Sequence, residues 1–430
     1  MKPRVAAGCS GQQIRLLAVL ILLAGAACLV KSLHRNRGNY AKVSMFEYYA
    51  WSSELRAGGD PWMSARDPAF KPLPGVLHLG HCNYPPAFLI AFEPLTRLPL
   101  RTAFWVWQAI LVGALCGAAV VMVRELAPPP GLDPYLIGIG AALLFPETYG
   151  MLYESQYTPI LLLLLVGAFA LDRRERSLPA GLMLAAATLL KMFPGLAGGY
   201  FFVRRRWPTL VWSVVVTLAG LMLTRARNEH SYVSAGILHS SWLEDDGFLR
   251  NSRAIALYYN LRALMDWLAG GPVSGSGLRL WLALTALADL LVVAVTFIST
   301  ARSHRSDAHD LAAFGLWICA ALLVSPIAWG HYLPLLLPLL FALGVLELRG
   351  ASLGWCARIL VLTGLTLISL GFFTSVVREL HAFFLATVAI FIGGNIILRR
   401  PYQGEAPGRS ARSPSVSRSG LQSAHGTALS

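Results

Sequence analysis

The stretch Thr102–Val123, TAFWVWQAILVGALCGAAVVMV, runs without one charged side chain. A helix needs roughly 20 mainly apolar residues to cross a bilayer, so this stretch is predicted to be a membrane-spanning helix. Comparable apolar runs follow along the chain at Ile14–Val30, Pro208–Leu223, Leu278–Ile298 and Ile359–Phe373. A water-soluble fold could not bury that much apolar surface. The sequence therefore predicts an all-α integral membrane protein.

The composition agrees with this class. Hydrophobic residues make up 56% of the 430 positions and charged residues only 13%, whereas soluble domains carry roughly a quarter of charged residues. A net charge of +14 would suggest nucleic-acid binding in a soluble protein, but here basic loops that fix the orientation in the membrane explain it. The six cysteines lack paired spacing, which argues against a disulfide framework or a zinc site. We expect no metal, cofactor or nucleic acid.

Clusters of basic residues between the apolar runs predict the orientation of the chain. The positive-inside rule assigns Asp172–Arg176, Arg204–Arg206 and Arg399–Arg400 to the cytoplasm. Residues 174–204 are too few for two full spans although both ends are basic, so we expect two short tilted helices that turn at Pro194. About twelve spans result, with both termini in the cytoplasm. The predicted spans cover residues 14–31, 101–123, 134–149, 157–171, 179–191, 195–203, 208–224, 279–299, 310–325, 332–348, 359–375 and 381–398.

The segments outside these spans complete the predicted domain organisation. Residues 1–13 form a cytoplasmic N-terminus and residues 14–398 the polytopic membrane domain. Residues 399–430 form a cytoplasmic tail that should be disordered, because it has almost no large apolar groups. Residues 32–100 and 225–278 are predicted to be outer segments with helices that lie along the membrane interface. The expected location is the plasma (inner) membrane, with the working site on the periplasmic or exterior side.

Polar residues gather at the predicted outer ends of the spans. Such groups are costly at membrane depth, so a functional role is a reasonable expectation for them as a set. One of them alone is as readily explained by a side chain that snorkels to the headgroups or pairs with a neighbour. No phosphate-binding glycine motif, nucleophile elbow or zinc spacing appears in the sequence. The residues concerned are Tyr84, Glu154, Gln156, Lys191, Arg253, Trp329 and His331.

The order of several short motifs resembles glycosyltransferase family 87, over roughly residues 40–345. The matching residues are Tyr48-Tyr49, Gly59-Asp60-Pro61, Tyr84-Pro85-Pro86 with Pro94, Gln156, Lys191 with Pro194, Asn251-Ser252, Ser325-Pro326, Trp329 and His331. The resemblance implies a type-C glycosyltransferase fold, in which a bundle of spans holds an outward-facing cavity for a lipid-phosphate sugar donor. It further implies transfer of a mannose-like or arabinose-like sugar to the hydroxyl of a lipid or glycan.

The chemistry of that transfer fits the residue types. A carboxylate takes the proton of the acceptor hydroxyl while positive charge develops on the sugar, and a cation such as Lys191 or Arg253 stabilises the departing phosphate. We predict His331 as a catalytic residue beside the carboxylate. The predicted donor- and phosphate-binding residues are Lys191, Arg253, Gln156, Tyr84, Tyr49 and Asn251, with Asp60, Glu154 and Trp329 as further candidates.

The chain departs from the family pattern at the base. The family aspartate is expected five residues before the second tyrosine of the Tyr-Tyr pair, where this chain has Ser44. A serine is no base at neutral pH, so Glu47, nearly on the same helix face, is the favoured replacement. Asp60 is the alternative, and an inactive protein is the other outcome.

Two further functional classes stay open. A carrier or flippase for lipid-linked glycans would use the same cationic pocket without a base, and an inactive scaffold in envelope glycan assembly would need neither. A transporter should show internal repeats with matching broken helices. The sequence has one such pair, around Lys191, which favours the enzyme.

Overall fold

The computed structural model describes residues 11–35, 43–62, 84–126, 131–227, 253–272, 274–326, 328–349, 354–379 and 381–400, with the single residues 75, 79, 82 and 128. Every regular element within these ranges is a helix, and extended pairing there is limited to one bridge between Ala254 and Trp329. Most of the predicted N-terminus and tail, together with Asn251, lies outside the described residues.

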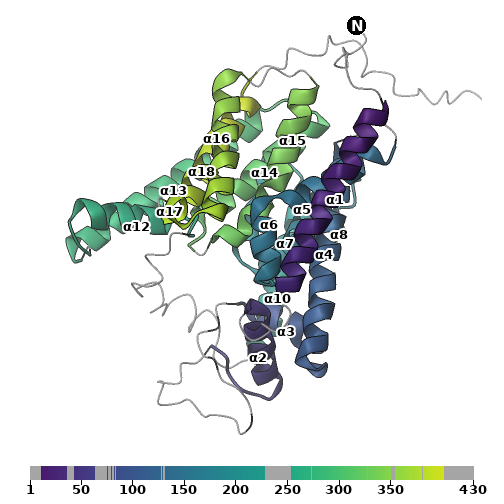
Figure 1. Ribbon diagram of the computed structural model, residues 1–430. Helices are drawn as coiled ribbons and strands as arrows, with labels where there is room; N and C mark the ends of the chain where they lie inside the picture. The colour runs from purple at the N-terminus through teal and green to yellow at the C-terminus, as the bar shows by residue number, and fades with distance from the viewer. Residues whose placement is uncertain are drawn as a thin grey trace, which may run out of the picture.

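The helices form a bundle with α1 along one side and with α2 and α3 at one end (Figure 1). The first half contains α1 (Gly11–Arg35), α2 (Ser44–Arg56), α3 (Pro86–Phe92), η2 (Glu93–Arg97), α4 (Leu100–Glu125), α5 (Asp133–Leu144), α6 (Pro146–Tyr153), α7 (Thr158–Arg173), α8 (Ser177–Leu190), η3 (Phe193–Ala197), α9 (Gly198–Val203) and α10 (Trp207–Arg227). The second half contains α12 (Leu257–Leu268), α13 (Ser276–Arg302), α14 (Asp307–Val324), η6 (Gly330–Leu336), α15 (Leu337–Leu348), α16 (Trp355–Phe373), α17 (Ser375–Glu379) and α18 (Ala382–Leu398).

The structure confirms an all-α protein with several candidate membrane spans, but it does not confirm about twelve. Within the described residues, six helical segments are long and apolar enough to cross a membrane: α1, α4, α13, α14, η6 with α15, and α16. A seventh results if α5 and α6, bent by 64° at their junction, count as one broken span. The apolar helices α8, α10 and α18, and η3 with α9, are shorter.

One end of the bundle carries a network of ion pairs, here called the arginine face, which is made by the ends of α4, α7, α9, α14 and α15. Arg174 pairs with Glu125 at 2.5 Å, Arg204 pairs with Asp310 at 2.7 Å, and Arg173 bridges Glu125 and Asp307. The predicted basic loops thus meet at one face. Its remaining members are Asp172, Arg206, Ser303, Glu347, Arg349 and Arg358.

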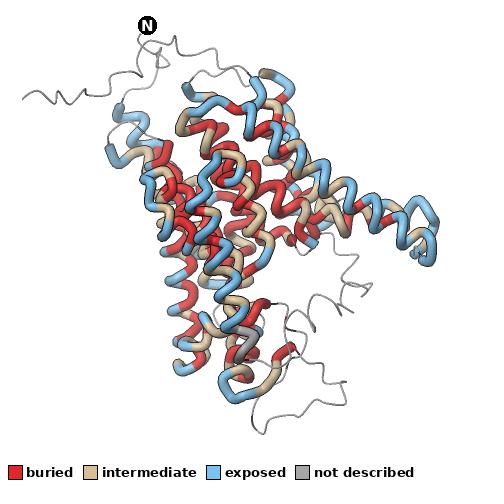
Figure 2. Tube along the Cα trace, turned by 180° about the vertical axis from the view of Figure 1, so that it is seen from behind, coloured by how far each residue is buried: buried red, intermediate tan, exposed pale blue. Residues whose placement is uncertain are grey.

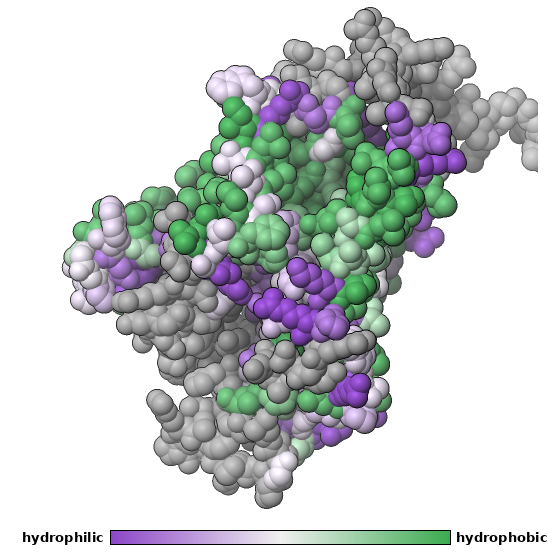
Figure 3. Space-filling view, in the orientation of Figure 1, coloured by the Kyte–Doolittle hydropathy of each residue, from purple (hydrophilic) through white to green (hydrophobic). Residues whose placement is uncertain are grey.

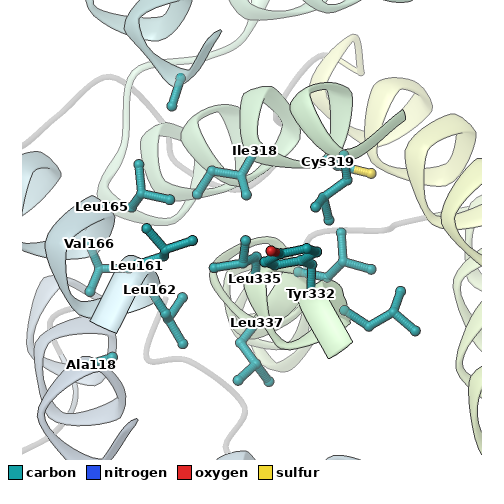
Figure 4. Packing of buried hydrophobic residues seen from close by; sticks show 14 of the residues in the cluster. Ala118, Leu161, Leu162, Leu165, Val166, Ile318, Cys319, Tyr332, Leu335 and Leu337 are labelled. Atoms are coloured by element: carbon teal, nitrogen blue, oxygen red, sulfur yellow. The ribbon is translucent and has the colours of Figure 1, made fainter. Parts of the chain in front are cut away.

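The interior between the two ends is an apolar core. Leu161, Leu162 and Leu165 of α7 face Tyr332 and Leu335 of η6, with α14 on the other side (Figure 4). Buried residues concentrate in the middle of the bundle, whereas the arm of α12 and α13 is largely exposed (Figure 2). Much of the upper outer surface is apolar, and polar residues gather below it (Figure 3). Lipid-facing helices and a packed interior account for both patterns.

Candidate functional site

Polar and aromatic side chains converge at the end of the bundle opposite the arginine face. α4 starts beside α2, where the Tyr49 hydroxyl donates to the Leu98 carbonyl at 2.9 Å, and it ends at Glu125 on the arginine face. α7 likewise starts just after Gln156 and ends at Arg173. The two clusters therefore occupy opposite ends of the same helices.

A chain of hydrogen bonds fastens α2 to the connection between α6 and α7. The Tyr48 hydroxyl donates to Gln156 Oε1 at 2.8 Å and lies 3.2 Å from the Tyr84 hydroxyl. Gln156 Nε2 donates to Ser44 Oγ at 2.7 Å, and the Ser44 amide donates to the Glu154 carbonyl at 3.1 Å. The position where the resemblance expects the base thus serves as a docking contact.

Ser155 forms the turn that presents Glu154 and Gln156. Its φ of 58° lies in the left-handed region, which disfavours any residue with a Cβ. Gln108 Nε2 donates to the Ser155 hydroxyl at 2.8 Å, and Trp107 Nε1 donates to the Ser155 carbonyl at 2.9 Å. These buried bonds offset the backbone cost.

Lys191 is a buried cation at the break between α8 and η3. Its side-chain nitrogen lies 4.9 Å from the ring centre of Tyr84 and 5.9 Å from that of Tyr332, and the residue is only 5% exposed. Within the described residues it has no carboxylate partner. Aromatic faces stabilise such a cation partly, but a buried charge normally needs an opposite charge. Lys191 is therefore suited to receive an anion.

Glu154 lies between Arg253 and His331. Glu154 Oε1 is 2.8 Å from Arg253 Nη1, and Oε2 is 3.7 Å from His331 Nδ1. Two backbone hydrogen bonds, from Gly330 N to Arg253 O at 2.9 Å and from Ile255 N to Ala328 O at 2.8 Å, join these distant segments. Trp329 contributes to the same pairing through its bridge with Ala254.

Gly330, which precedes His331, has no room for a side chain. A Cβ there would come within 2.7 Å of the Phe383 ring. The phenylalanine occupies the space that a side chain at this position would need. The carboxylate beside His331 comes from Glu154.

The other predicted carboxylates lie in different surroundings. Glu47 is exposed on α2, and neither an ion pair nor a hydrogen bond to its carboxylate occurs among the described residues. Protein atoms that remove part of its solvent, and then the charge of Glu154, raise the pKa of Glu47 above its ordinary value. Asp60 Oδ1 accepts from the Trp62 amide at 3.0 Å, and Trp62 Nε1 in turn donates to the Tyr84 carbonyl at 2.8 Å. Asp60 therefore shapes the turn that supports Tyr84.

The structure thus brings together most of the predicted set. Tyr49 is one exception, since its hydroxyl is bonded to the backbone carbonyls of Thr96 and Leu98 on another face of α2. Glu47 and Asp60, in the surroundings described above, are the others. Asn251 lies outside the described residues. Sequence reasoning missed the roles of Tyr48 and Tyr332, although both adjoin predicted residues. No group of three or more potential metal ligands gathers anywhere in the described part of the chain. The residues brought together are Tyr84, Glu154, Gln156, Lys191, Arg253, Trp329 and His331.

Comparison with known proteins identifies the family. A model of glycosyltransferase family 87 matches residues 83–326, which is more than half of the chain. The chain belongs to glycosyltransferase family 87. The match covers the segments that supply Tyr84, Glu154, Lys191 and Arg253, and it places the chain among membrane glycosyltransferases.

Three relatives are mycobacterial mannosyltransferases. Two are polyprenol-phosphate-mannose-dependent mannosyltransferases of Mycolicibacterium smegmatis. One acts on phosphatidylinositol pentamannoside and is 26% identical over 66% of this chain and 66% of its own length. The other acts on phosphatidylinositol mannoside and is 28% identical over 70% of this chain and 71% of its own length. A phosphatidylinositol pentamannoside mannosyltransferase of Mycobacterium tuberculosis is 26% identical over 80% of this chain and 77% of its own length. No solved structure matches the chain.

Proposed function

We propose that this family 87 protein transfers a sugar from a polyprenyl-phosphate donor to the hydroxyl of a lipid or glycan. The burial of Lys191 is the observation that supports the proposal. This cation has no carboxylate partner in the described part of the chain, so it is suited to a lipid-borne phosphate. The relatives, which use polyprenol-phosphate-mannose, make mannose the first sugar to test and arabinose the second.

The reaction uses the site residues in complementary roles. Lys191 and Arg253 bind the phosphate and stabilise the charge that develops on it when the bond to the sugar breaks. Tyr48, Tyr84 and Gln156 hold α2 against the α6–α7 turn and so form one wall of the site. A carboxylate beside this wall accepts the acceptor proton. No cofactor is needed, since the phosphate remains on its lipid.

The arrangement of charge supports a topology in which the site opens outside the cytoplasm. Arginines at the opposite face would then lie inside, and residues 14–398 would form the membrane domain, with α2 and α12 along the outer interface. Arg35 is basic at the site end, but its guanidinium lies 4.6 Å from the Tyr153 ring centre, where an aromatic face partly stabilises it.

The topology is tested by cysteine labelling. Glu47→Cys and Arg176→Cys, each in a variant without native cysteines, are treated in intact cells with a membrane-impermeant maleimide. We expect label at position 47 only, and label at both positions or only at 176 would contradict the outward-facing site.

The activity is tested with membranes that contain the protein, polyprenyl-phosphate carrying radiolabelled mannose or arabinose, and a native lipid extract as acceptor. We expect the label to move to a new glycolipid or glycan with release of polyprenyl phosphate. Movement of intact labelled donor across vesicles would instead identify the flippase. If the protein neither transfers the sugar nor moves the donor, the remaining explanation is an inactive scaffold.

A further inference from the structure

We propose that Glu154 is the base of the transfer reaction and that Arg253 restrains it until the donor phosphate binds. This inference rests on the proposed function and goes beyond it, because it names the carboxylate that takes the proton and the event that frees it.

The position of Glu154 distinguishes it from the other carboxylates at this end of the bundle. Glu147 is 8% exposed within α6, Asp60 holds the turn before Trp62, and Glu47 projects from the surface of α2. Glu154 lies at the end of α6 with its side chain 30% exposed. A base must reach both a bound substrate and its own orienting partners, and Glu154 meets these conditions.

The backbone around Glu154 holds it in place. The next residue, Ser155, has the left-handed conformation fixed by Trp107 and Gln108, and the Glu154 carbonyl accepts from the first residue of α2. These bonds hold the backbone of Glu154 on both sides of the turn. Only the carboxylate itself is therefore expected to exchange partners.

Arg253 is the group that a phosphate would draw away from Glu154. Its guanidinium binds one carboxylate oxygen, and the arginine side chain remains 46% exposed. Arginine binds phosphate and carboxylate oxygens in the same two-point geometry. A donor phosphate that also contacts Lys191 competes for the guanidinium. Glu154 then keeps only the neighbouring His331 and becomes free to accept a proton.

The bond changes of this step balance. The acceptor oxygen forms a bond to the anomeric carbon of the sugar while its hydrogen passes to a carboxylate oxygen of Glu154. The bond between the anomeric carbon and the phosphate oxygen breaks, and its electron pair leaves with polyprenyl phosphate. Arg253 and Lys191 stabilise that charge. The products are the glycoside, polyprenyl phosphate and protonated Glu154, which later releases its proton to water.

The charges that face Glu154 predict the pH dependence. Arg253 from the segment before α12 and His331 from η6 contact it, while Glu47 on α2 and Glu147 on α6 interact with it electrostatically. Burial raises the pKa of Glu154, and Arg253 opposes this rise. Removal of the arginine charge therefore raises the pKa further. Since only the deprotonated carboxylate is a base, the acid limb of activity should move to higher pH.

The test compares Glu154→Gln and Arg253→Gln with Glu93→Gln as the matched control. Glu93 is a carboxylate at the same end of the bundle that pairs with Arg97 at 3.7 Å, outside the site. A general base contributes roughly 10²- to 10⁴-fold, so we expect Glu154→Gln to lose at least about 100-fold in transfer rate. Donor binding, measured by competition with a photoreactive polyprenyl-phosphate analogue, should stay within a few-fold of the parent.

Two further readouts separate a base from a structural residue. Arg253→Gln should raise the KM for the donor and shift the acid limb upward, and formate should partly restore transfer by Glu154→Ala. Transfer by Glu154→Gln at the parental rate would overturn the proposal. Loss of transfer in Glu47→Gln but not in Glu154→Gln would overturn it too, and would make Glu47 the base. A parental protein without any transfer would instead refute the proposed function itself.

Discussion

Replacement of Lys191 by methionine tests whether the buried cation binds the donor. Methionine keeps most of the length and volume of the side chain and removes the charge with its three N–H donors. Loss of one member of a buried charge pair costs about 2–5 kcal/mol. We take about 3 kcal/mol because Tyr84 and Tyr332 already stabilise the cation in the free protein. At 1.36 kcal/mol per tenfold change in rate, kcat/KM for the donor should fall roughly 150-fold.

The free protein should respond in the opposite sense. Lys191 is desolvated without a carboxylate partner among the described residues, so its replacement removes an unfavourable charge and two cation–π contacts whose effects offset each other. We expect an unchanged or higher thermal midpoint in detergent. Lys31→Met, an exposed position on α1, is the control and should leave transfer unaffected. Parental kcat/KM in Lys191→Met would refute the assignment of Lys191 to the phosphate.

Two glycine substitutions test close approaches between helices. Gly315→Ala on α14 places a Cβ 2.5 Å from the Leu339 amide nitrogen of α15, so the helices must separate and the detergent melting temperature should fall by the equivalent of about 1–3 kcal/mol. Gly344→Ala has no atom within 4 Å of the new Cβ, and this control should melt at or above the parental temperature because alanine favours a helix. In Gly330→Ala the new Cβ would come within 2.7 Å of the Phe383 ring and displace His331. We therefore expect sugar transfer in membranes to fall more than the melting temperature. Transfer at the parental rate would contradict the close packing at this position.

The long spans could be predicted from sequence, whereas the number of crossings could not. An uncharged run such as Thr102–Val123 has one stable solution in a bilayer, and it lies inside α4. The predicted span 195–203 instead falls on η3 and α9, and α9 has 6 residues. At 1.5 Å per residue, such a helix is about 9 Å long against a hydrocarbon core of roughly 30 Å. The length of such a run alone therefore does not decide whether it crosses the membrane.

The candidate site was predictable where polar residues interrupt apolar runs. Lys191 and His331 could be found because their neighbours would otherwise be membrane helix. The distinction between Tyr48 and Tyr49 could not be made, since adjacent helix residues point about 100° apart and only the docking of α2 decides which one faces Gln156. The contact of Arg253 with Glu154 depends on pairing between segments far apart in sequence, which no local pattern encodes.

The break at Lys191 links the two ends of the bundle. α8 leaves the arginine face and α9 returns to it, because Arg206 lies 3.3 Å from Asp172 and Arg204 pairs with Asp310. A single continuous helix through this segment would carry Arg204 to the opposite end. These ion pairs hold the returning end of a hairpin whose tip places Lys191 near the rings of Tyr84 and Tyr332. The position of this buried cation thus depends on charges at the far face of the protein.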